Sequence, residues 1–395
     1  MVEGCGRHGT PSHGKRTQQL AEDEAQCPSP ANQTPEKSTE HANASVGQGG
    51  SVQLPTGARM PRFALGTGGF GGLSGKDGRA AIFSALKLGY RAIDTAEMNR
   101  NLLDVAWACL KSNLPRGELF IIAKIAPWHY GYQQTQKAFA RQLEELRLGY
   151  VDLLLLQWPF VWDPDQRAWG AEQWQRCAGW SAAQKKGSWK ALEDLYKRGT
   201  ARAVGVSNFT VEQLEGLLKW CNVKPHVVQA ESNPHWPNTG LRNWCRRNEI
   251  IFQGYAPLGG QATDYNRQQR ALELDLIKEI ADHNLATPAQ VCLNWNLARN
   301  DATVVKSRTP RYLRENLSAC QIQIHPRDLK EIDQVGPGMA EYGPVYWGFN
   351  DRDAMNPFVD EEGLQEELLA ANRSPAYHVQ AKSRPAHGGA RSAAP

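Results

Sequence analysis

The sequence predicts an α/β fold: a closed (β/α)8 (TIM) barrel with disordered N- and C-terminal tails. Short apolar runs alternate eight times with stretches of helical spacing over about 275 residues. Strands that are apolar along their whole length and separated by helices indicate a parallel sheet covered on both faces. Eight such repeats favour a closed barrel, for which about 250 residues is usual. A doubly wound open sheet is the alternative, weakened because the glycine-rich segment 68–72 lacks the GxGxxG spacing.

Composition excludes several other classes of protein. The 395 residues carry 45 Lys+Arg against 41 Asp+Glu, and the net charge of +4 is too small to indicate a nucleic-acid surface. No apolar run approaches the ~18 residues that a membrane span requires. The eight cysteines form no CxxC pair, so we expect reduced thiols and no metal site. The N-terminus lacks an apolar signal-peptide core, so we expect a cytoplasmic protein.

The two ends of the chain differ in composition from its centre. Residues 1–50 contain only four residues of the Leu, Ile, Val, Phe, Met, Trp and Tyr set, and the last residues are rich in Gly, Ala, Ser and Pro. Such segments cannot bury enough apolar surface to offset their chain entropy. We therefore expect a disordered tail over 1–50, a barrel over 51–335, a C-terminal loop and helix over 336–375, and a disordered tail over 376–395.

The predicted strands are short apolar runs bounded by glycine, proline or polar residues. A segment with a turn signal at its centre, 52–60, precedes them and could form a hairpin that plugs the barrel floor. We predict the eight barrel strands at 62–67, 91–94, 119–124, 151–157, 203–206, 227–231, 250–255 and 303–306.

The predicted helices carry apolar residues at three- and four-residue spacing. Asn208 or Thr210 is placed to cap the helix that begins at Val211, and Pro310 occupies the first turn of the last helix. We predict helices at 78–88, 102–110, 134–146, 189–198, 211–220, 241–248, 272–283, 288–297 and 310–320.

In a (β/α)8 barrel the functional residues lie at the carboxyl ends of the strands. Asp94 and Lys124 end neighbouring strands, and two buried charges this close must neutralise each other or shift their pKa values. Either the two form a purely structural ion pair, or the aspartate holds the lysine in position for proton transfer. The other strand-end residues are Thr67, Gln157, Trp158, Ser207, Asn208, Gln229, Glu231, Tyr255, Lys306 and Ser307.

Seven segments of the chain resemble those of the aldo-keto reductases, in the right order and spacing. They are 89–96 (GYRAIDTA), 119–124 (LFIIAK), 152–159 (DLLLLQWP), 205–209 (GVSNF), 228–231 (VQAE), 255–259 (YAPLG) and 305–307 (VKS). The resemblance covers roughly residues 52–335. It implies a barrel that binds NADPH in extended form and reduces an aldehyde or ketone to an alcohol.

The resemblance also implies the cofactor contacts. Ser207, Asn208 and Gln229 would hydrogen-bond the nicotinamide amide, and Tyr255 would stack on its ring. Asp94 is also implied as a cofactor contact. The others are Thr67 near the ribose, Lys306 and Ser307 at the 2′-phosphate, and Glu315 and Asn316 at adenine. The family usually places an arginine where Tyr312 stands here, and Arg311 or Arg308 could substitute for it.

The catalytic set departs from the family pattern. Family members use Asp, Tyr, Lys and His, and Asp94 and Lys124 match two of these. The tyrosine position is Asn99 and the histidine position is Gln157. An amide cannot protonate an alkoxide, and losing a general acid slows such a step by ~10²–10⁴-fold. Gln157 can still donate a hydrogen bond to a carbonyl oxygen.

Three functional interpretations follow. The first is a working reductase in which Lys124 protonates the product through a water, or in which Tyr130 or Tyr132 supplies the proton. The second is a catalytically inactive regulatory protein that binds NADPH, and the third is a scaffold with a vestigial site. The full set of cofactor contacts argues against the third.

The loops after the strands indicate an aromatic-lined substrate site. Trp128, Tyr130 and Trp158 are the pocket candidates, while the tryptophan-rich insertion 160–188 forms either a pocket wall or a small core under a long loop. We expect a small carbonyl substrate and no nucleic-acid or membrane partner. The oligomeric state is left open, and a monomer is compatible with the sequence.

Overall fold

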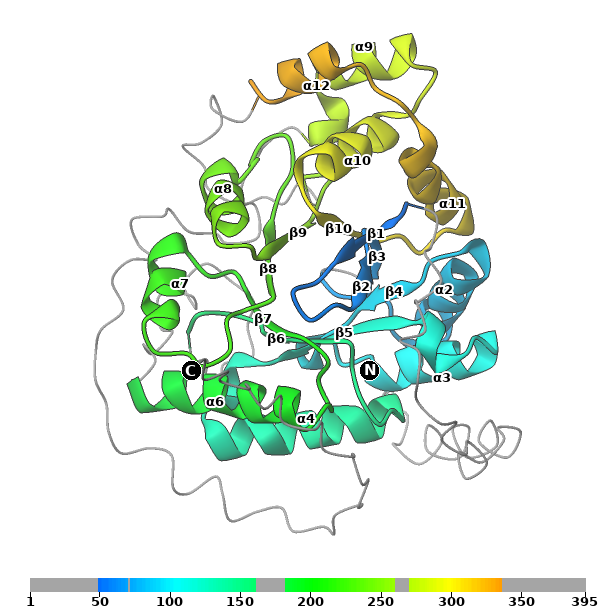
Figure 1. Cartoon of the computed structure of the whole chain (residues 1–395). Coiled ribbons are helices and arrows are strands. Elements are labelled where there is room, and N and C mark those ends of the chain that lie inside the picture. Colours follow the sequence, from blue (N-terminus) through cyan, green and yellow to red (C-terminus); the bar gives the residue numbers. More distant parts are fainter. Residues whose placement is uncertain (1–48, 70–71, 161–181, 260–269, 336–395) are drawn as a thin grey trace, which may run out of the picture. The chain divides into compact units, whose positions relative to one another are not determined.

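The computed structural model describes residues 49–69, 72–160, 182–259 and 270–335 (Figure 1). The predicted C-terminal loop and helix and the two predicted tails lie outside the described residues, apart from Gly49 and Gly50. The insertion tryptophans also lie outside them: Trp162, Trp169, Trp174 and Trp180.

Eight parallel strands close into a barrel in the order β10-β3-β4-β5-β6-β7-β8-β9, which confirms the predicted fold class (Figure 1). Each strand lies within two residues of its predicted position, and nearly all of its residues are buried because helices cover the outside and side chains fill the inside. The strands are β3 (Phe63–Gly66), β4 (Ala92–Asp94), β5 (Phe120–Ile125), β6 (Leu153–Leu156), β7 (Val204–Ser207), β8 (Val227–Glu231), β9 (Ile251–Tyr255) and β10 (Ala302–Val305).

A short hairpin closes one end of the barrel, as predicted. Strands β1 (Ser51–Gln53) and β2 (Arg59–Pro61) pair antiparallel. Leu54 and Met60 of the hairpin pack in one apolar cluster with Phe120 and Leu153. These two are the first residues of β5 and β6, so the hairpin plugs the amino-terminal end. The carboxyl ends of the strands form the opposite end.

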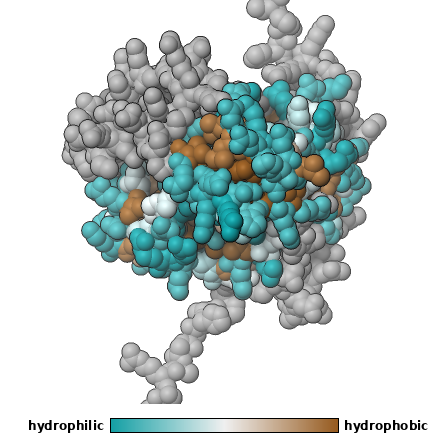
Figure 2. Space-filling model, turned by 90° about the horizontal axis from the view of Figure 1, so that it is seen from above, coloured by the Kyte–Doolittle hydropathy of each residue, from teal (hydrophilic) through white to brown (hydrophobic). Residues whose placement is uncertain are grey.

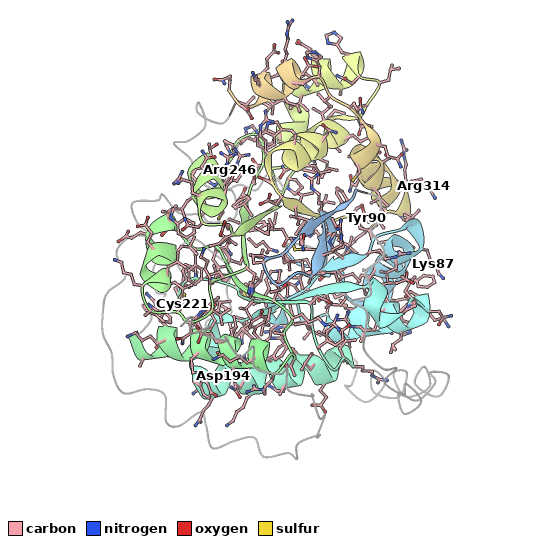
Figure 3. All side chains as sticks on the ribbon, viewed as in Figure 1. Lys87, Tyr90, Asp194, Cys221, Arg246 and Arg314 are labelled. Atoms are coloured by element: carbon pink, nitrogen blue, oxygen red, sulfur yellow. The ribbon has the colours of Figure 1, made fainter. Side chains whose placement is uncertain are left out.

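Helices form the outer layer of the barrel. They are α2 (Gly75–Leu88), α3 (Leu102–Ser112), α4 (Tyr132–Leu146), α6 (Ala182–Lys197), α7 (Val211–Leu218), α8 (Thr239–Arg247), α9 (Asp275–His283), α10 (Pro288–Arg299), α11 (Pro310–Ser318) and α12 (Pro326–Ile332). Lys87, Asp194, Arg246 and Arg314, labelled in Figure 3, come from this layer. Hydrophilic side chains cover most of the described surface in Figure 2, with apolar patches between them. Among the described helices, none is long and apolar enough to cross a membrane.

The helix boundaries confirm one predicted cap, correct one expectation and add one helix. Thr210 caps α7 through a capping box with Gln213. The insertion predicted at 160–188 is wrong in its last part, because α6 begins at Ala182. Helix α12 was not predicted, and Ile332 in it packs in the apolar cluster that contains Trp295 of α10.

A buried histidine makes the stability of the fold sensitive to acid. His226 is 7% exposed, its Nδ1 accepts a hydrogen bond from the Val204 N–H at 3.0 Å, and Tyr196 packs on its ring. Burial lowers the pKa of His226 from 6.5 to about 4. As pH falls, the unfolded chain therefore takes up this proton before the folded chain does. The histidine's contribution to stability is complete above pH 6.5 and is lost between pH 6.5 and about 4.

We expect this histidine to account for about 3 kcal/mol of unfolding free energy lost between pH 6.5 and 4. Urea unfolding at several pH values measures the loss. In the matched variant His226→Asn the amide oxygen can still accept from Val204 but does not titrate, so its stability should change less over the same interval. Equal pH dependence in both proteins would assign the effect to other groups.

Candidate active site

Two buried charged side chains meet at the carboxyl ends of β4 and β5. Lys124 Nζ lies 2.5 Å from Asp94 Oδ1, and the residues are 5% and 7% exposed. Lys124 also donates to the Thr95 carbonyl at 3.3 Å. A lysine ammonium has three N–H donors. Described residues therefore accept from two of them, and the third has no acceptor in the part of the chain that the structure describes. The structure thus brings together the pair that strand-end spacing predicted.

A glutamine from β8 binds the other oxygen of the aspartate. Gln229 Nε2 donates to Asp94 Oδ2 and to Gln253 Oε1, at 2.8 Å in each case. Both N–H groups of Gln229 are thereby used, which leaves its Oε1 as the acceptor of the side chain.

Asn208 connects two other predicted site residues, Gln157 and Tyr255. It follows β7 in the left-handed region, with φ 66°. Its Nδ2 donates to the Gln157 carbonyl at 3.0 Å, and its Oδ1 accepts from the Tyr255 hydroxyl at 2.8 Å. Gln157 Oε1 is buried and has no hydrogen-bond partner among the described residues. Ser207, the residue before Asn208, is 2% exposed.

Asn99 lies against the loop after β3. Its Nδ2 donates to Thr67 Oγ1 at 3.3 Å, and the Thr67 hydroxyl donates in turn to the Asp94 carbonyl at 3.0 Å. A Cβ atom added at Gly68 would lie 2.3 Å from Asn99 Oδ1. The amide of Asn99 therefore fills the space that any side chain at position 68 would need.

Two cationic side chains from the loop after β10 hydrogen-bond to the described ends of the glycine-rich segment 68–72. Lys306 Nζ donates to the Gly68 carbonyl at 2.9 Å, and the Arg308 guanidinium donates to the Gly72 carbonyl at 2.7 Å. Burial and the nearby Arg308 charge lower the pKa of Lys306. Ser307 Oγ accepts from the Thr309 N–H at 3.2 Å. Of the predicted phosphate-binding residues, Lys306 thus lies beside Gly68, the residue that Asn99 packs against.

The three predicted residues of α11 face different surroundings. Arg311 is exposed, and its guanidinium lies 6.0 Å from the Tyr312 ring centre. Glu315 accepts a hydrogen bond from Thr287 Oγ1 at 2.8 Å. Asn316 is buried, with 3% exposure. Of the three, Arg311 is the most accessible to an anion in solution.

The two tyrosines considered as proton donors are engaged elsewhere. The Tyr130 hydroxyl donates to the Trp158 carbonyl at 2.7 Å and accepts from the Trp158 N–H at 3.0 Å, and burial raises its pKa. Tyr132 is exposed on α4 and donates to Asp194 of α6 at 3.0 Å. The structure therefore does not support either hydroxyl as the acid, and Tyr130 supports the Trp158 backbone instead.

The tryptophans predicted for the pocket differ in burial. Trp158 is 8% exposed and its ring stacks on Phe160 at 5.4 Å between ring centres. Trp128 is half-buried, and its ring meets His129 edge to face.

Tyr130→Phe tests the role of this hydroxyl. The variant leaves the Trp158 N–H and carbonyl without their partner, so we expect a loss of about 1–3 kcal/mol in unfolding free energy. Any reductase turnover should persist, because the hydroxyl lies in a backbone contact. A fall in turnover of ~10²-fold or more with stability retained would instead mark Tyr130 as the acid.

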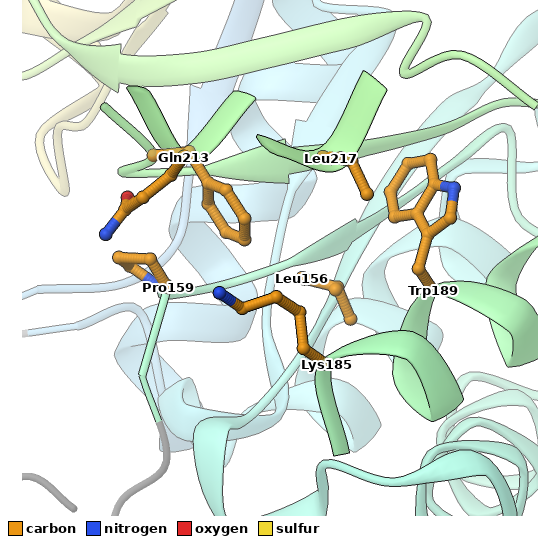
Figure 4. A pocket seen from close by; sticks show the side chains of 7 residues that line it. Leu156, Pro159, Lys185, Trp189, Gln213 and Leu217 are labelled. Atoms are coloured by element: carbon orange, nitrogen blue, oxygen red, sulfur yellow. The ribbon is translucent and has the colours of Figure 1, made fainter. Parts of the chain in front are cut away.

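A separate small pocket lies among β6, α6 and α7 (Figure 4). It is lined by Leu156, Pro159, Lys185, Trp189, Phe209, Gln213 and Leu217. Burial lowers the pKa of Lys185. The lining includes none of the predicted site residues, so this pocket belongs to the outer helical layer rather than to the barrel mouth.

Sequence reasoning missed one polar residue of the site. Gln253 is fully buried in β9, where its partners in register are Gln229 of β8 and Ala302 of β10. The available signal was a glutamine in the apolar run 250–255, two residues before Tyr255 and hence on the same face of the strand.

Comparisons with known proteins agree with this arrangement. The model of the family described as "Aldo/keto reductase family" matches residues 62–337. The chain is 34% identical over 297 residues to the glyoxal reductase of Bacillus subtilis, covering 74% of this chain and 96% of the relative. It is 30% identical over 299 residues to the morphine 6-dehydrogenase of Pseudomonas putida, covering 74% and 94%.

Solved structures show the same likeness. An aldo-keto reductase from a Medee basin deep-sea metagenome library superposes with a TM-score of 0.62 at 30% identity, covering 73% of this chain and 95% of that one. The aldose reductase of Schistosoma japonicum superposes with a TM-score of 0.64 at 27% identity, covering 72% and 92%. The closed barrel, the family match over its whole length and these relatives lead to one conclusion: the chain belongs to the aldo/keto reductase family.

Proposed function

We propose that the protein uses NADPH to reduce a small aldehyde or ketone to an alcohol, with Lys124 in place of the missing tyrosine as proton donor. The observation that carries this proposal is the buried Lys124–Asp94 pair, whose lysine keeps one N–H group beyond those bonded to Asp94 and Thr95. The relatives named as reductases and dehydrogenases support the same class of reaction.

The residues beside this pair fit a nicotinamide group. A carboxamide has one acceptor oxygen and two N–H donors. Gln229 offers Oε1 as an acceptor because both of its N–H groups are used, and the Ser207 hydroxyl can donate. Tyr255, hydrogen-bonded to Asn208, offers an aromatic face. When bound, NADPH supplies the hydride that reduces the carbonyl carbon.

The other predicted cofactor contacts favour a dinucleotide that carries a 2′-phosphate. Lys306, Ser307 and Arg311 would meet the 2′-phosphate, where charge-assisted hydrogen bonds are strong. Lys306 already donates a hydrogen bond to the carbonyl of Gly68, the residue after Thr67. By the family pattern, Thr67 would lie near the ribose, and Glu315 and Asn316 near adenine.

The chain's own residues then provide orientation and a proton. Gln157, with a buried side-chain oxygen that lacks a described partner, can turn its amide N–H toward the substrate carbonyl. Lys124 donates through its third N–H, directly or through a water, to the oxygen that gains negative charge. Asp94 holds the ammonium in place, and solvent returns the proton after the product leaves.

A second candidate is an NADPH-binding regulatory protein without carbonyl chemistry. The observation that favours it is that the Asn99 side chain is used within the protein: it donates a hydrogen bond to Thr67 and packs on Gly68. A site in which residue 99 holds the loop after β3 and supplies no acid would bind the dinucleotide without reducing a carbonyl.

Two measurements on the purified protein separate these functions. NADPH should quench the tryptophan fluorescence in a saturable way under both proposals, and absence of saturable binding would overturn both. Aromatic and aliphatic aldehydes, including glyoxal, should then cause NADPH oxidation if the protein is a reductase. Binding without oxidation by any aldehyde would favour the regulatory function.

A further inference from the structure

Four buried polar side chains from four strands are linked by a continuous series of hydrogen bonds inside the barrel. Gln253 of β9 accepts from Gln229 of β8, Gln229 donates to Asp94 of β4, and Asp94 pairs with Lys124 of β5. All four are less than 8% exposed. Gln253 is the last residue in this series of hydrogen bonds and has no role in the function proposed above.

The charge of Asp94 determines how the two amides are oriented. A carboxylate only accepts hydrogen bonds, so Gln229 must present its NH₂ group to it. The second N–H of that group then needs an acceptor, and Gln253 supplies Oε1 at 2.8 Å. As a result Gln253 Nε2 is buried without a hydrogen-bond partner among the described residues.

Gln253 gains little stability from its polar group. Its Oε1 accepts from Gln229, but its buried Nε2, which has no partner among the described residues, carries a cost that offsets this hydrogen bond. What Gln253 provides is geometric. One hydrogen bond to Asp94 lets the Gln229 amide rotate about the line joining the bonded atoms, whereas a second bond at a different angle fixes the plane of the amide.

We propose that Gln253 is a positioning residue, which fixes the amide plane of Gln229 so that Gln229 Oε1 accepts a hydrogen bond from the nicotinamide carboxamide. The inference rests on the proposed NADPH binding. It assigns Gln253 an effect on cofactor affinity that acts through Gln229 and is separate from the stability of the barrel.

Gln253→Met tests the proposal, because methionine keeps the side-chain length and removes both the acceptor and the unpaired N–H group. We expect the NADPH dissociation constant, measured by fluorescence quenching, to rise by about 3- to 10-fold. The thermal midpoint without cofactor should change little, because the variant removes the unpartnered Gln253 N–H group but leaves one Gln229 N–H without its acceptor. Ile251→Met is the matched control, since it changes the same strand two residues away and should leave the affinity unchanged.

A double-mutant cycle separates an action through Gln229 from a general disturbance. In a Gln229→Met background, Gln253→Met should not weaken NADPH binding further. Additive losses of affinity, an unchanged affinity in Gln253→Met, or a variant that loses its fold would each overturn the inference. Failure of the unchanged protein to bind NADPH would instead overturn the proposed function, so the two failures can be told apart.

Discussion

Replacing Lys124 with methionine is expected to lower aldehyde-dependent NADPH oxidation by ~10²–10⁴-fold, the usual effect of losing a general acid. The same change should cost about 3–5 kcal/mol of stability, because it leaves the Asp94 carboxylate buried without its cation. Steady-state kinetics at saturating NADPH measures the first effect, and urea unfolding measures the second. Lys190→Met is a suitable control, since Lys190 pairs with Asp194 on the surface of α6.

A companion variant separates the two interpretations of the Asp94–Lys124 pair. Asp94→Asn combined with Lys124→Met removes both charges, so much of the lost stability should return. A purely structural ion pair predicts that turnover returns with it. A lysine that donates the proton predicts that turnover stays low, and turnover near the original level in the double variant would exclude Lys124 as the acid.

The barrel and its strand ends could be predicted because they depend on patterns that are local in the sequence. Apolar runs and helical spacing placed all eight strands, and the hairpin could be predicted from its turn signal. The pairing of Asp94 with Lys124 followed because neighbouring parallel strands end at the same edge of a barrel. The start of α6 was missed because the segment before Trp189 contains Gly187 and several polar residues, a composition typical of loops.

The hydrogen bonds inside the site could not be predicted in the same way. Asp94 and Gln229 are 135 positions apart, and their contact depends on side-chain conformations that four strands determine together. The same holds for Tyr130, whose position suggested the substrate site but whose hydroxyl binds the Trp158 backbone. Spacing shows which residues reach the barrel mouth, and packing decides which atom of each is left for a ligand.

Asn99→Tyr should raise aldehyde-dependent NADPH oxidation, by up to ~10²-fold or more if the new hydroxyl acts as a general acid. Asn99 lies within hydrogen-bond reach of Thr67, whose hydroxyl bonds to the Asp94 carbonyl, so a side chain at position 99 starts near the proposed reacting groups. The measurement is turnover with one aldehyde over a range of pH. A gain that depends on Lys124, and is absent in Asn99→Tyr combined with Lys124→Met, would show that the tyrosine works with the existing pair.

The matched control Asn99→Phe distinguishes proton donation by the new hydroxyl from an effect of the larger ring alone. A tyrosine ring cannot follow the present direction of the Asn99 side chain, because Gly68 lies in contact with the amide and a Cβ there would already overlap it at 2.3 Å. The ring must therefore turn away from Gly68, and both aromatic variants give up the hydrogen bond to Thr67. If Asn99→Tyr is faster than Asn99→Phe, the hydroxyl donates a proton. Equal rates in the two variants would mean that position 99 affects the reaction only through the shape of the loop after β3, which Asn99 contacts.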